Sequence, residues 1–365
     1  MRAIAAIAIN TLKETVRQPA YGLVLIVACV VLLASSTAFV GHIYTFGAGS
    51  DLDNPAERMV ADIGLSTILL AGMALGILST VNVVHREIEN RTAATVLSKR
   101  ISRSAFMAGK FFGVGGAVGL ACVTCLFFLM LTMRAGVNIM ASDRYDWGVL
   151  GGMILSLVIA LLVATARNYY WRRAWIGTFT LVFMSCIFVL FVIFTGFDKV
   201  YHPVFFPALS GEALDAISGW DREKVGVLYD YETMKAGITM IMAVLLMTSI
   251  ALVAATRLAP GGNLAVTGFV AAMGLTSQYC YDKINSYASS TAYWNEYFGV
   301  TFPQMLYNVY YALIPNLQHF WMSDALGREE PIPWIYVGQC GVYAIFYLVA
   351  MLGLSMFLFE RREVN

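Results

Sequence analysis

The sequence predicts an all-α membrane protein, a polytopic bundle with about eight transmembrane helices. Hydrophobic residues make up 59% of the 365 residues, charged residues make up 13%, and the mean hydropathy is +0.70. A single soluble globule of this length cannot bury so much apolar surface. The apolar residues also fall into long runs, and the charged residues gather in the connections between those runs.

Eight mostly apolar segments are long enough to cross a bilayer at about 20 residues per crossing. They cover residues 21–45, 62–84, 111–133, 148–166, 174–196, 236–256, 263–280 and 334–359. The seventh is the least apolar. We treat residues 1–365 as a single transmembrane domain.

Basic residues near membrane spans stay in the cytoplasm. With both termini cytoplasmic, the eight spans place 15 of the 24 basic residues inside and 18 of the 23 acidic residues outside. This asymmetry predicts a multi-pass protein of the cell (cytoplasmic) membrane, in contact with membrane lipid. The net charge of +1 argues against a nucleic-acid partner, which requires a concentrated basic face.

Residues 2–17 predict an amphipathic helix that lies in the membrane interface. Its polar face holds Asn10, Lys13, Glu14 and Arg17, and its apolar face holds Ile4, Ala5, Ala8, Ile9, Leu12 and Val16. Pro19 breaks this helix before the first span. Two alternatives stay open: residues 1–18 extend the first transmembrane helix, or the chain is processed after Ala34 or Ala38.

The connector at residues 85–110, between the second and third spans, carries six basic and two acidic residues. Thr92 to Leu97 predict a short exposed helix with an apolar side, the form of a lever that docks on a separate cytoplasmic subunit. The alternative is a solvated loop that only enforces topology. The candidate coupling residues are Glu87, Glu89, Thr92, Val96, Leu97, Lys99, Arg100 and Arg103.

Two long outer loops are expected, at residues 197–235 and 281–333. Within the second, residues 303–321 are apolar but interrupted by Pro303 and Pro315, as in a re-entrant or interfacial hairpin. An aromatic belt on a folded outer loop explains the same residues.

Small-x-x-x-small pairs lie in the second and third spans: Gly72 with Gly76, Gly109 with Gly113, and Gly115 with Gly119. Such spacings let helices approach closely. They predict that the second and third spans are tightly packed, which would join the connector rigidly to the core.

The sequence indicates no enzyme and no cofactor. The four histidines are scattered, Cys122 and Cys125 lie inside a span where packing is their expected role, and no metal site is predicted. A pairing of Cys280 with Cys340 stays open. The chain lacks a G-x-x-x-x-G-K-[ST] motif, so any ATP hydrolysis belongs to another polypeptide.

Three motifs carry a resemblance to a known family. The connector reads E-x-E-x-x-T, then V-L-S-K-x-I-S-R and F-x-x-G-K, between Glu87 and Lys110. IPNLQHF at 314–320 with FERRE at 359–363, and ATRLAP at 255–260, match further segments. Together they resemble the permeases of type-2 ABC exporters, particularly the branch that includes copper-enzyme-maturation permeases.

The resemblance implies a transmembrane subunit whose 85–110 connector holds a coupling helix seated on a cytoplasmic P-loop ATPase. It also implies a homodimer or a pair with a related permease, six spans, an interfacial N-terminal helix and re-entrant outer helices. The chain departs from that pattern by an extra hairpin at 148–196.

The leading hypothesis is therefore the permease subunit of an ATP-driven exporter. The alternative is a non-transporting membrane anchor or accessory subunit of a larger complex. An intramembrane hydrolase is a third class, for which the sequence supplies no recognisable nucleophile and base.

Overall fold

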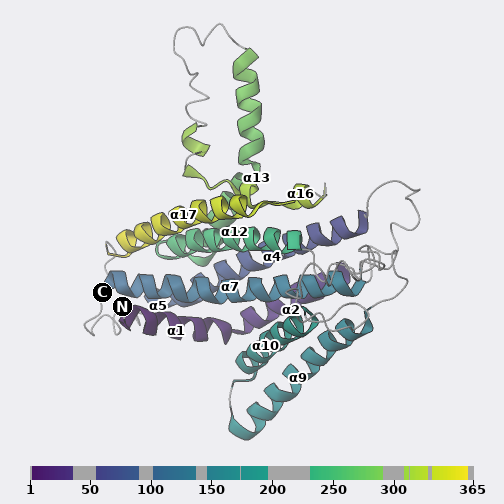
Figure 1. Ribbon diagram of the computed structural model, residues 1–365. Helices are drawn as coiled ribbons and strands as arrows, with labels where there is room; N and C mark the ends of the chain where they lie inside the picture. Colours follow the sequence, from purple (N-terminus) through teal and green to yellow (C-terminus); the bar gives the residue numbers. More distant parts are fainter. Residues whose placement is uncertain are drawn as a thin grey trace.

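The computed structural model describes residues 2–35, 55–89, 102–136, 146–172, 174–195, 231–290, 308–311, 313–327 and 331–360. Within these ranges all regular structure is helical. The chain is an all-α polytopic membrane protein, as its composition predicts. Both chain ends lie at one end of the helix bundle, here called the terminal end (Figure 1).

Three helices form the centre of the bundle: α4 (Pro55–Thr80), α7 (Arg103–Gly136) and α12 (Tyr231–Ala255). Between 61% and 72% of the apolar part of each is buried. Three peripheral helices, α9 (Trp147–Trp171), α10 (Trp175–Thr195) and α17 (Trp334–Glu360), are buried over only 17% to 33%. Their outward faces carry large apolar side chains, as membrane lipid requires.

Eight spans were predicted, and the described residues hold a smaller set of helices that could cross a membrane. Six helices in the described residues are long and apolar enough to cross a bilayer, or seven if the bent pair α1 and α2 counts as one span. The predicted seventh span is absent from this set. It is a helix, α13 (Pro260–Ser290), but polar residues such as Asn263, Thr267 and Ser277 occupy its buried face and lower its hydropathy. Figure 1 shows α13 rising out of the bundle, across the direction of α7.

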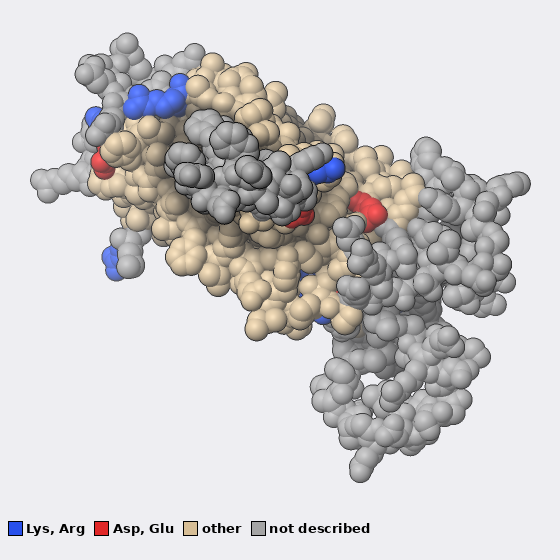
Figure 2. Space-filling model, turned by 90° about the horizontal axis from the view of Figure 1, so that it is seen from above, with Lys and Arg blue, Asp and Glu red and all other residues tan. Residues whose placement is uncertain are grey.

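Charged residues are sparse on the bundle surface. Figure 2 shows Lys, Arg, Asp and Glu as small separate patches on a surface that is otherwise uncharged where it is described. So few charges on the described surface fit a protein that is surrounded largely by hydrocarbon.

The N-terminal segment is bent at the predicted place. α1 (Arg2–Val16) and α2 (Pro19–Ala34) meet at 63°, because Pro19 provides no N–H to continue α1. The predicted polar face of α1 is exposed, but its buried face is displaced from the prediction. Thr11 and Thr15 are buried, and Ile9 is 55% exposed.

This displacement follows from contact between α1 and α7. A methyl group at Gly109 would lie 2.6 Å from Cβ of Ile7, and one at Gly113 would lie 2.5 Å from Cβ of Thr11. The two glycines thus form a shallow channel that receives the Ile7 and Thr11 side of α1. The close approach of the two helices buries Thr11, which the sequence pattern had not placed on the apolar face.

The second and third predicted spans, α4 and α7, do pack against each other, and their glycines also bring in two further helices, α12 and α1. Gly109 and Gly113 of α7 receive α1. Gly72 of α4 lies against Val244 of α12 and Cys122 of α7, and Gly76 lies against Thr248 of α12. Gly115 and Gly119 have only Leu245 nearby, at 3.8 to 3.9 Å from an added methyl group. Helix α4 therefore uses its glycines to approach both α12 and α7, where Gly64 lies against Leu129.

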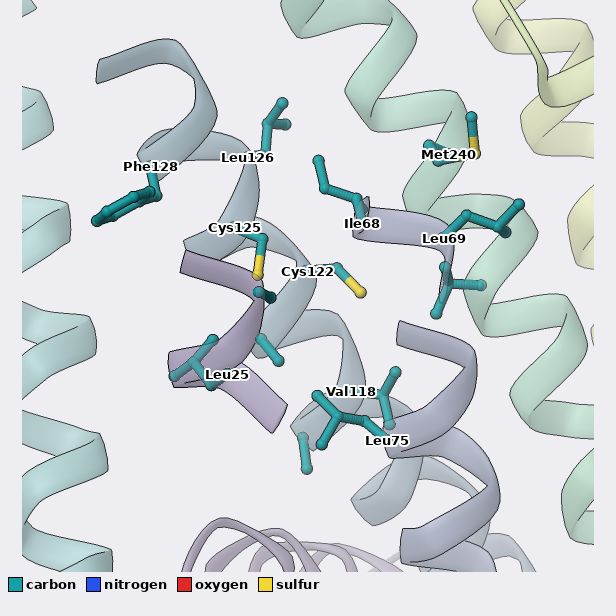
Figure 3. Close-up of a cluster of buried hydrophobic side chains, with 14 of the residues drawn as sticks. Leu25, Ile68, Leu69, Leu75, Val118, Cys122, Cys125, Leu126, Phe128 and Met240 are labelled. Carbon is teal, nitrogen blue, oxygen red and sulfur yellow. The ribbon is translucent and has the colours of Figure 1, made fainter. Parts of the chain in front are cut away.

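Apolar side chains and thiols fill the space among α2, α4, α7 and α12 (Figure 3). Cys122 points toward α4 and Cys125 toward α2, and both are buried. All six cysteines are free thiols, so Cys280 and Cys340 are not paired with each other.

The hairpin of α9 and α10 is the predicted extra pair, and a buried ion pair anchors it. Nε of Arg134, near the end of α7, lies 3.1 Å from Oδ2 of Asp146, and the two side chains are 2% and 5% exposed. Asp146 also caps α9, because its Oδ1 accepts a hydrogen bond from the Val149 N–H. Arg134 further donates to the carbonyl of Phe194 at the end of α10. One arginine thus joins three helices.

Helix α9 ends at a residue in a left-handed conformation. Arg172 has φ 48° and ψ 34°, and its N–H donates to the carbonyls of Arg167 and Asn168. This position normally favours glycine, because a Cβ crowds the following carbonyl. Arg172→Gly is expected to raise the free energy of unfolding by about 1 kcal/mol. Thermal unfolding in detergent measures this, and an unchanged or lower midpoint would contradict it.

The segment before α17 is fixed to the bundle at several points. It contains a 3₁₀ helix, Leu317–Phe320, and the short helix α16, Ser323–Gly327. The carbonyl of Phe320 accepts a hydrogen bond from Thr239 of α12, and Ser323 donates to Asp62 of α4. The predicted outer loop at 281–333 is therefore partly helical, and its first ten residues continue α13.

Candidate functional site

Helix α4 extends without interruption into the predicted connector. A π-helical turn, Val81–His85, follows α4, and α5 (Arg86–Glu89) follows that turn. Isolated π-helical turns are frequent at functional sites, because they change the direction in which the side chains after the turn point. A continuous helical path therefore runs from Pro55 to Glu89, and it ends at the terminal end of the bundle.

Glu87 forms an ion pair with Lys110 on α7. The carboxylate Oε1 and the ammonium Nζ are 2.6 Å apart. Lys110 is almost fully buried, whereas the side chain of Glu87 is 25% exposed. Lys110 also lies 5.5 Å from the centre of the Phe106 ring, which stacks on Phe359 of α17. This pair links the start of the connector to α7 and, through Phe106, to the last helix.

The end of the connector is fixed as well. Arg103, at the start of α7, donates to the carbonyl of Glu360 at 3.0 Å, and Arg257 donates to the carbonyl of Leu358 at 2.8 Å. Both cations therefore satisfy carbonyls at the C-terminal end of α17, where the helix dipole favours positive charge. These two hydrogen bonds join the end of α17 to the connector and to the turn between α12 and α13.

A polar groove of about 510 Å³ lies beside this pair, at the bend between α1 and α2. Its lining residues are Glu14, Gln18, Pro19, Ala20, Asn82, Arg86 and Glu87. Across the groove floor, the Asn82 amide donates to Oε1 of Gln18 at 3.2 Å. The groove therefore joins the N-terminal bend to the helical path that leads to the connector.

Burial raises the pKa of the Glu87 carboxyl, and the neighbouring Glu14 raises it further, while Lys110 opposes both. A raised pKa in the folded state means that the folded protein takes up this proton before the unfolded chain does. As the pH falls, protonation of Glu87 therefore increases the free energy of unfolding. Glu87→Gln removes the contribution.

We expect the unfolding midpoint of the wild type, relative to Glu87→Gln, to rise as the pH falls from about 7 to about 4.5. Parallel thermal scans of both proteins in detergent measure the difference. A difference that stays constant, or that falls with acidification, would show that Glu87 is not held in the environment described above.

Two of the eight predicted coupling residues, Glu87 and Arg103, have described side chains. Both contact the bundle. Glu89 is the last residue of α5. The remaining five, Thr92, Val96, Leu97, Lys99 and Arg100, lie outside the described residues, as does the predicted short helix there.

Several participants were not predicted as site residues. Lys110 appeared in the sequence only as one base of a basic connector, yet it is buried inside α7. Gln18, Asn82 and the carbonyl of Glu360 gave no signal, because each is placed by contacts between distant segments. An ionisable residue inside an apolar helix usually has a partner, and this rule applied to Lys110 would have suggested one.

A second polar cluster lies away from this site, around Asn316. The side-chain nitrogen of Asn316 lies 3.1 Å from Oε1 of Gln278 on α13 and 3.1 Å from the Tyr311 hydroxyl. The backbone N–H of Asn316 donates to the Tyr343 hydroxyl. Asn316 belongs to the IPNLQHF segment. The cluster joins α13 and α17, so this motif has a structural role in the fold.

Within the described ranges, no group of three or more His, Cys, Asp or Glu side chains is arranged to hold a metal ion. Neither the search of protein-family models nor the search of curated proteins gives a match to this chain.

Proposed function

We propose that this protein is the transmembrane permease subunit of an ATP-driven exporter of the ABC type, moved by a separate cytoplasmic P-loop ATPase. The observation that carries this proposal is the attachment of the connector at both sides. Glu87 pairs with Lys110 at its start, and Arg103 binds the end of α17 at its finish. The sequence resemblance of the connector to a coupling helix supports the same conclusion.

The attachments give the connector mechanical leverage on the bundle. A displacement of residues 90–101 acts on α4 through the continuous helical path and on α7 through the Glu87–Lys110 pair. Both helices belong to the central trio, so they transmit motion as rigid elements to α12. A second copy of the chain, or a related permease, completes the pathway across the membrane.

Affinity purification of the full-length protein from its own membranes tests the proposal. The expected result is co-purification of a polypeptide that has a Walker A motif and hydrolyses ATP. Leu97→Asp and Glu87→Gln are expected to reduce the recovery of that polypeptide. Asp282→Asn, on the exposed part of α13, is the control that changes one acid elsewhere. Recovery that is unaffected by the connector variants would contradict the coupling role.

The cytoplasmic position of the connector is tested separately. A cysteine at position 98, in place of Ser98, should resist a membrane-impermeant thiol reagent in intact cells and react after the cells are opened. Reaction in intact cells would place the connector outside and overturn the proposal.

A membrane anchor or accessory subunit is the alternative function. The low burial of α9, α10 and α17 favours it, because these faces suit contact with other membrane proteins. A purified complex that holds other membrane subunits and lacks any nucleotide-binding chain would support this alternative over the exporter.

A further inference from the structure

The hairpin of α9 and α10 has an aromatic and basic tip, defined here as residues 167–172 with Trp175. Arg167 and Arg172 are exposed, and so are the rings of Tyr169, Tyr170 and Trp171, at 79%, 72% and 67%. Large aromatic side chains at such exposure in water would be unfavourable. Their presence at the end of a membrane hairpin requires a surface that accepts both rings and cations.

The charge of the hairpin is of one sign and is confined to the tip. Between Asp146 and Asp198 the sequence contains no acidic residue, and its only basic residues are Arg167, Arg172 and Arg173. A ligand that matches this surface is therefore anionic. The exposed guanidinium groups of Arg167 and Arg172 are suited to phosphate oxygens, which they bind through paired N–H groups.

The rest of the hairpin determines where the tip lies relative to the bilayer. Side chains such as Ile154, Leu162, Phe188 and Val192 are at least half exposed and apolar, so the flanks of both helices face lipid. Helix α9 has 25 residues, about 37 Å, which slightly exceeds the hydrocarbon thickness of about 30 Å. The tip thus comes at the point where the apolar flank ends, which is the depth of lipid headgroups.

Internal contacts hold the tip in shape. Trp175 donates its indole N–H to Thr165 at 3.2 Å and stacks on Phe179 at 5.4 Å, which braces the turn. The rings of Tyr169 and Tyr170 meet edge to face at 5.2 Å. Near the start of α10, Gly177 lies against Arg17 of the N-terminal bend, and this contact brings another exposed arginine close to the tip.

We propose that the tip of the α9–α10 hairpin is a binding site for the headgroups of anionic phospholipids in the bilayer. Arg167 and Arg172 contact the phosphate, and Tyr169, Tyr170 and Trp171 lie among the headgroups and the first acyl carbons. The site does not depend on the proposed transport function, because it requires only that the hairpin crosses a membrane.

Native mass spectrometry of the full-length protein in a neutral detergent tests this site. The protein is titrated with phosphatidylglycerol or phosphatidylcholine, and bound lipid is counted. Arg167→Gln with Arg172→Gln is expected to weaken phosphatidylglycerol binding about 25-fold, at about fivefold for each arginine, and to leave phosphatidylcholine binding unchanged. Arg2→Gln with Lys283→Gln removes the same charge elsewhere and should retain wild-type binding.

The double lysine variant, Arg167→Lys with Arg172→Lys, should retain most of the preference for phosphatidylglycerol, and it reports whether the tip still folds. If the double glutamine variant does not fold, Arg172→Gln alone should weaken binding about fivefold. Wild-type affinity in the glutamine variants, or an equal loss in the Arg2 and Lys283 control, overturns the proposal. Displacement of the lipid by an equimolar amount of soluble glycerol phosphate overturns it too, since it assigns the site to a soluble anion.

Discussion

Arg134→Met should lower the free energy of unfolding by about 3–5 kcal/mol, because it leaves the carboxylate of Asp146 buried without its cation. The same change removes the hydrogen bond from Arg134 to the carbonyl of Phe194. The α9–α10 hairpin thus loses its attachment to α7 at this end. Thermal unfolding in detergent measures the loss, and faster proteolysis of the hairpin relative to the wild type locates it.

A double variant, Arg134→Met with Asp146→Leu, serves as the test of cause. It removes both charges, so it should recover much of the lost stability. A double-mutant cycle with the two single variants measures the energy of interaction between Arg134 and Asp146. Arg103→Met is the matched control: it removes an exposed cation from the other end of α7 and should cost no more than about 1 kcal/mol. If Arg134→Met and Arg103→Met lower the free energy of unfolding equally, the buried pair contributes no more to stability than an exposed cation does.

Gly113→Ala is expected to destabilise the protein by about 1–3 kcal/mol, although it adds a single methyl group. That methyl group would lie 2.5 Å from Cβ of Thr11 and 2.7 Å from the carbonyl oxygen of Ala8. A backbone oxygen cannot rotate away as a flexible side chain does, so α1 must move off α7. A lower unfolding midpoint and faster cleavage of α1 by protease measure this displacement.

Gly119→Ala, six residues further along α7, is the control. Its methyl group meets only Leu245, at 3.8 Å, which is ordinary van der Waals contact. Alanine also has a higher helix propensity than glycine, so this variant should be neutral or slightly more stable. If both alanine variants behave alike, the α1–α7 contact is looser than described.

Hydropathy predicted the spans whose sequence is apolar on every side. The predicted 148–166 and 174–196 correspond to α9 and α10, and 334–359 to α17, with ends that differ by few residues. The environment of helix α13 was harder to predict, because its apolar side chains Leu264 and Phe269 face outward while its packed face is polar. A window average cannot separate these two faces of one helix.

The position of the candidate site followed from the charge distribution, whereas its internal contacts did not. The basic composition of 85–110 and its acidic start indicated a connector, and Glu87 was among the candidates. Its partner Lys110 is 23 residues away and lies on another helix, so only the packing of α5 against α7 reveals the pair. The same holds for Thr11, which is buried against Gly113 of α7.

The π-helical turn at Val81–His85 sets the direction in which Glu87 points. Each residue of a helix advances the side chains by about 100° around its axis, and a π-turn accommodates one residue more than a regular turn does. Loss of one residue from Val81–His85 would therefore rotate Glu87 away from Lys110 and turn a neighbouring side chain toward α7. The number of residues in this turn therefore determines whether the Glu87 carboxylate faces Lys110. A change in that number would separate the start of the connector from α7, although Glu87 and Lys110 themselves would be unchanged.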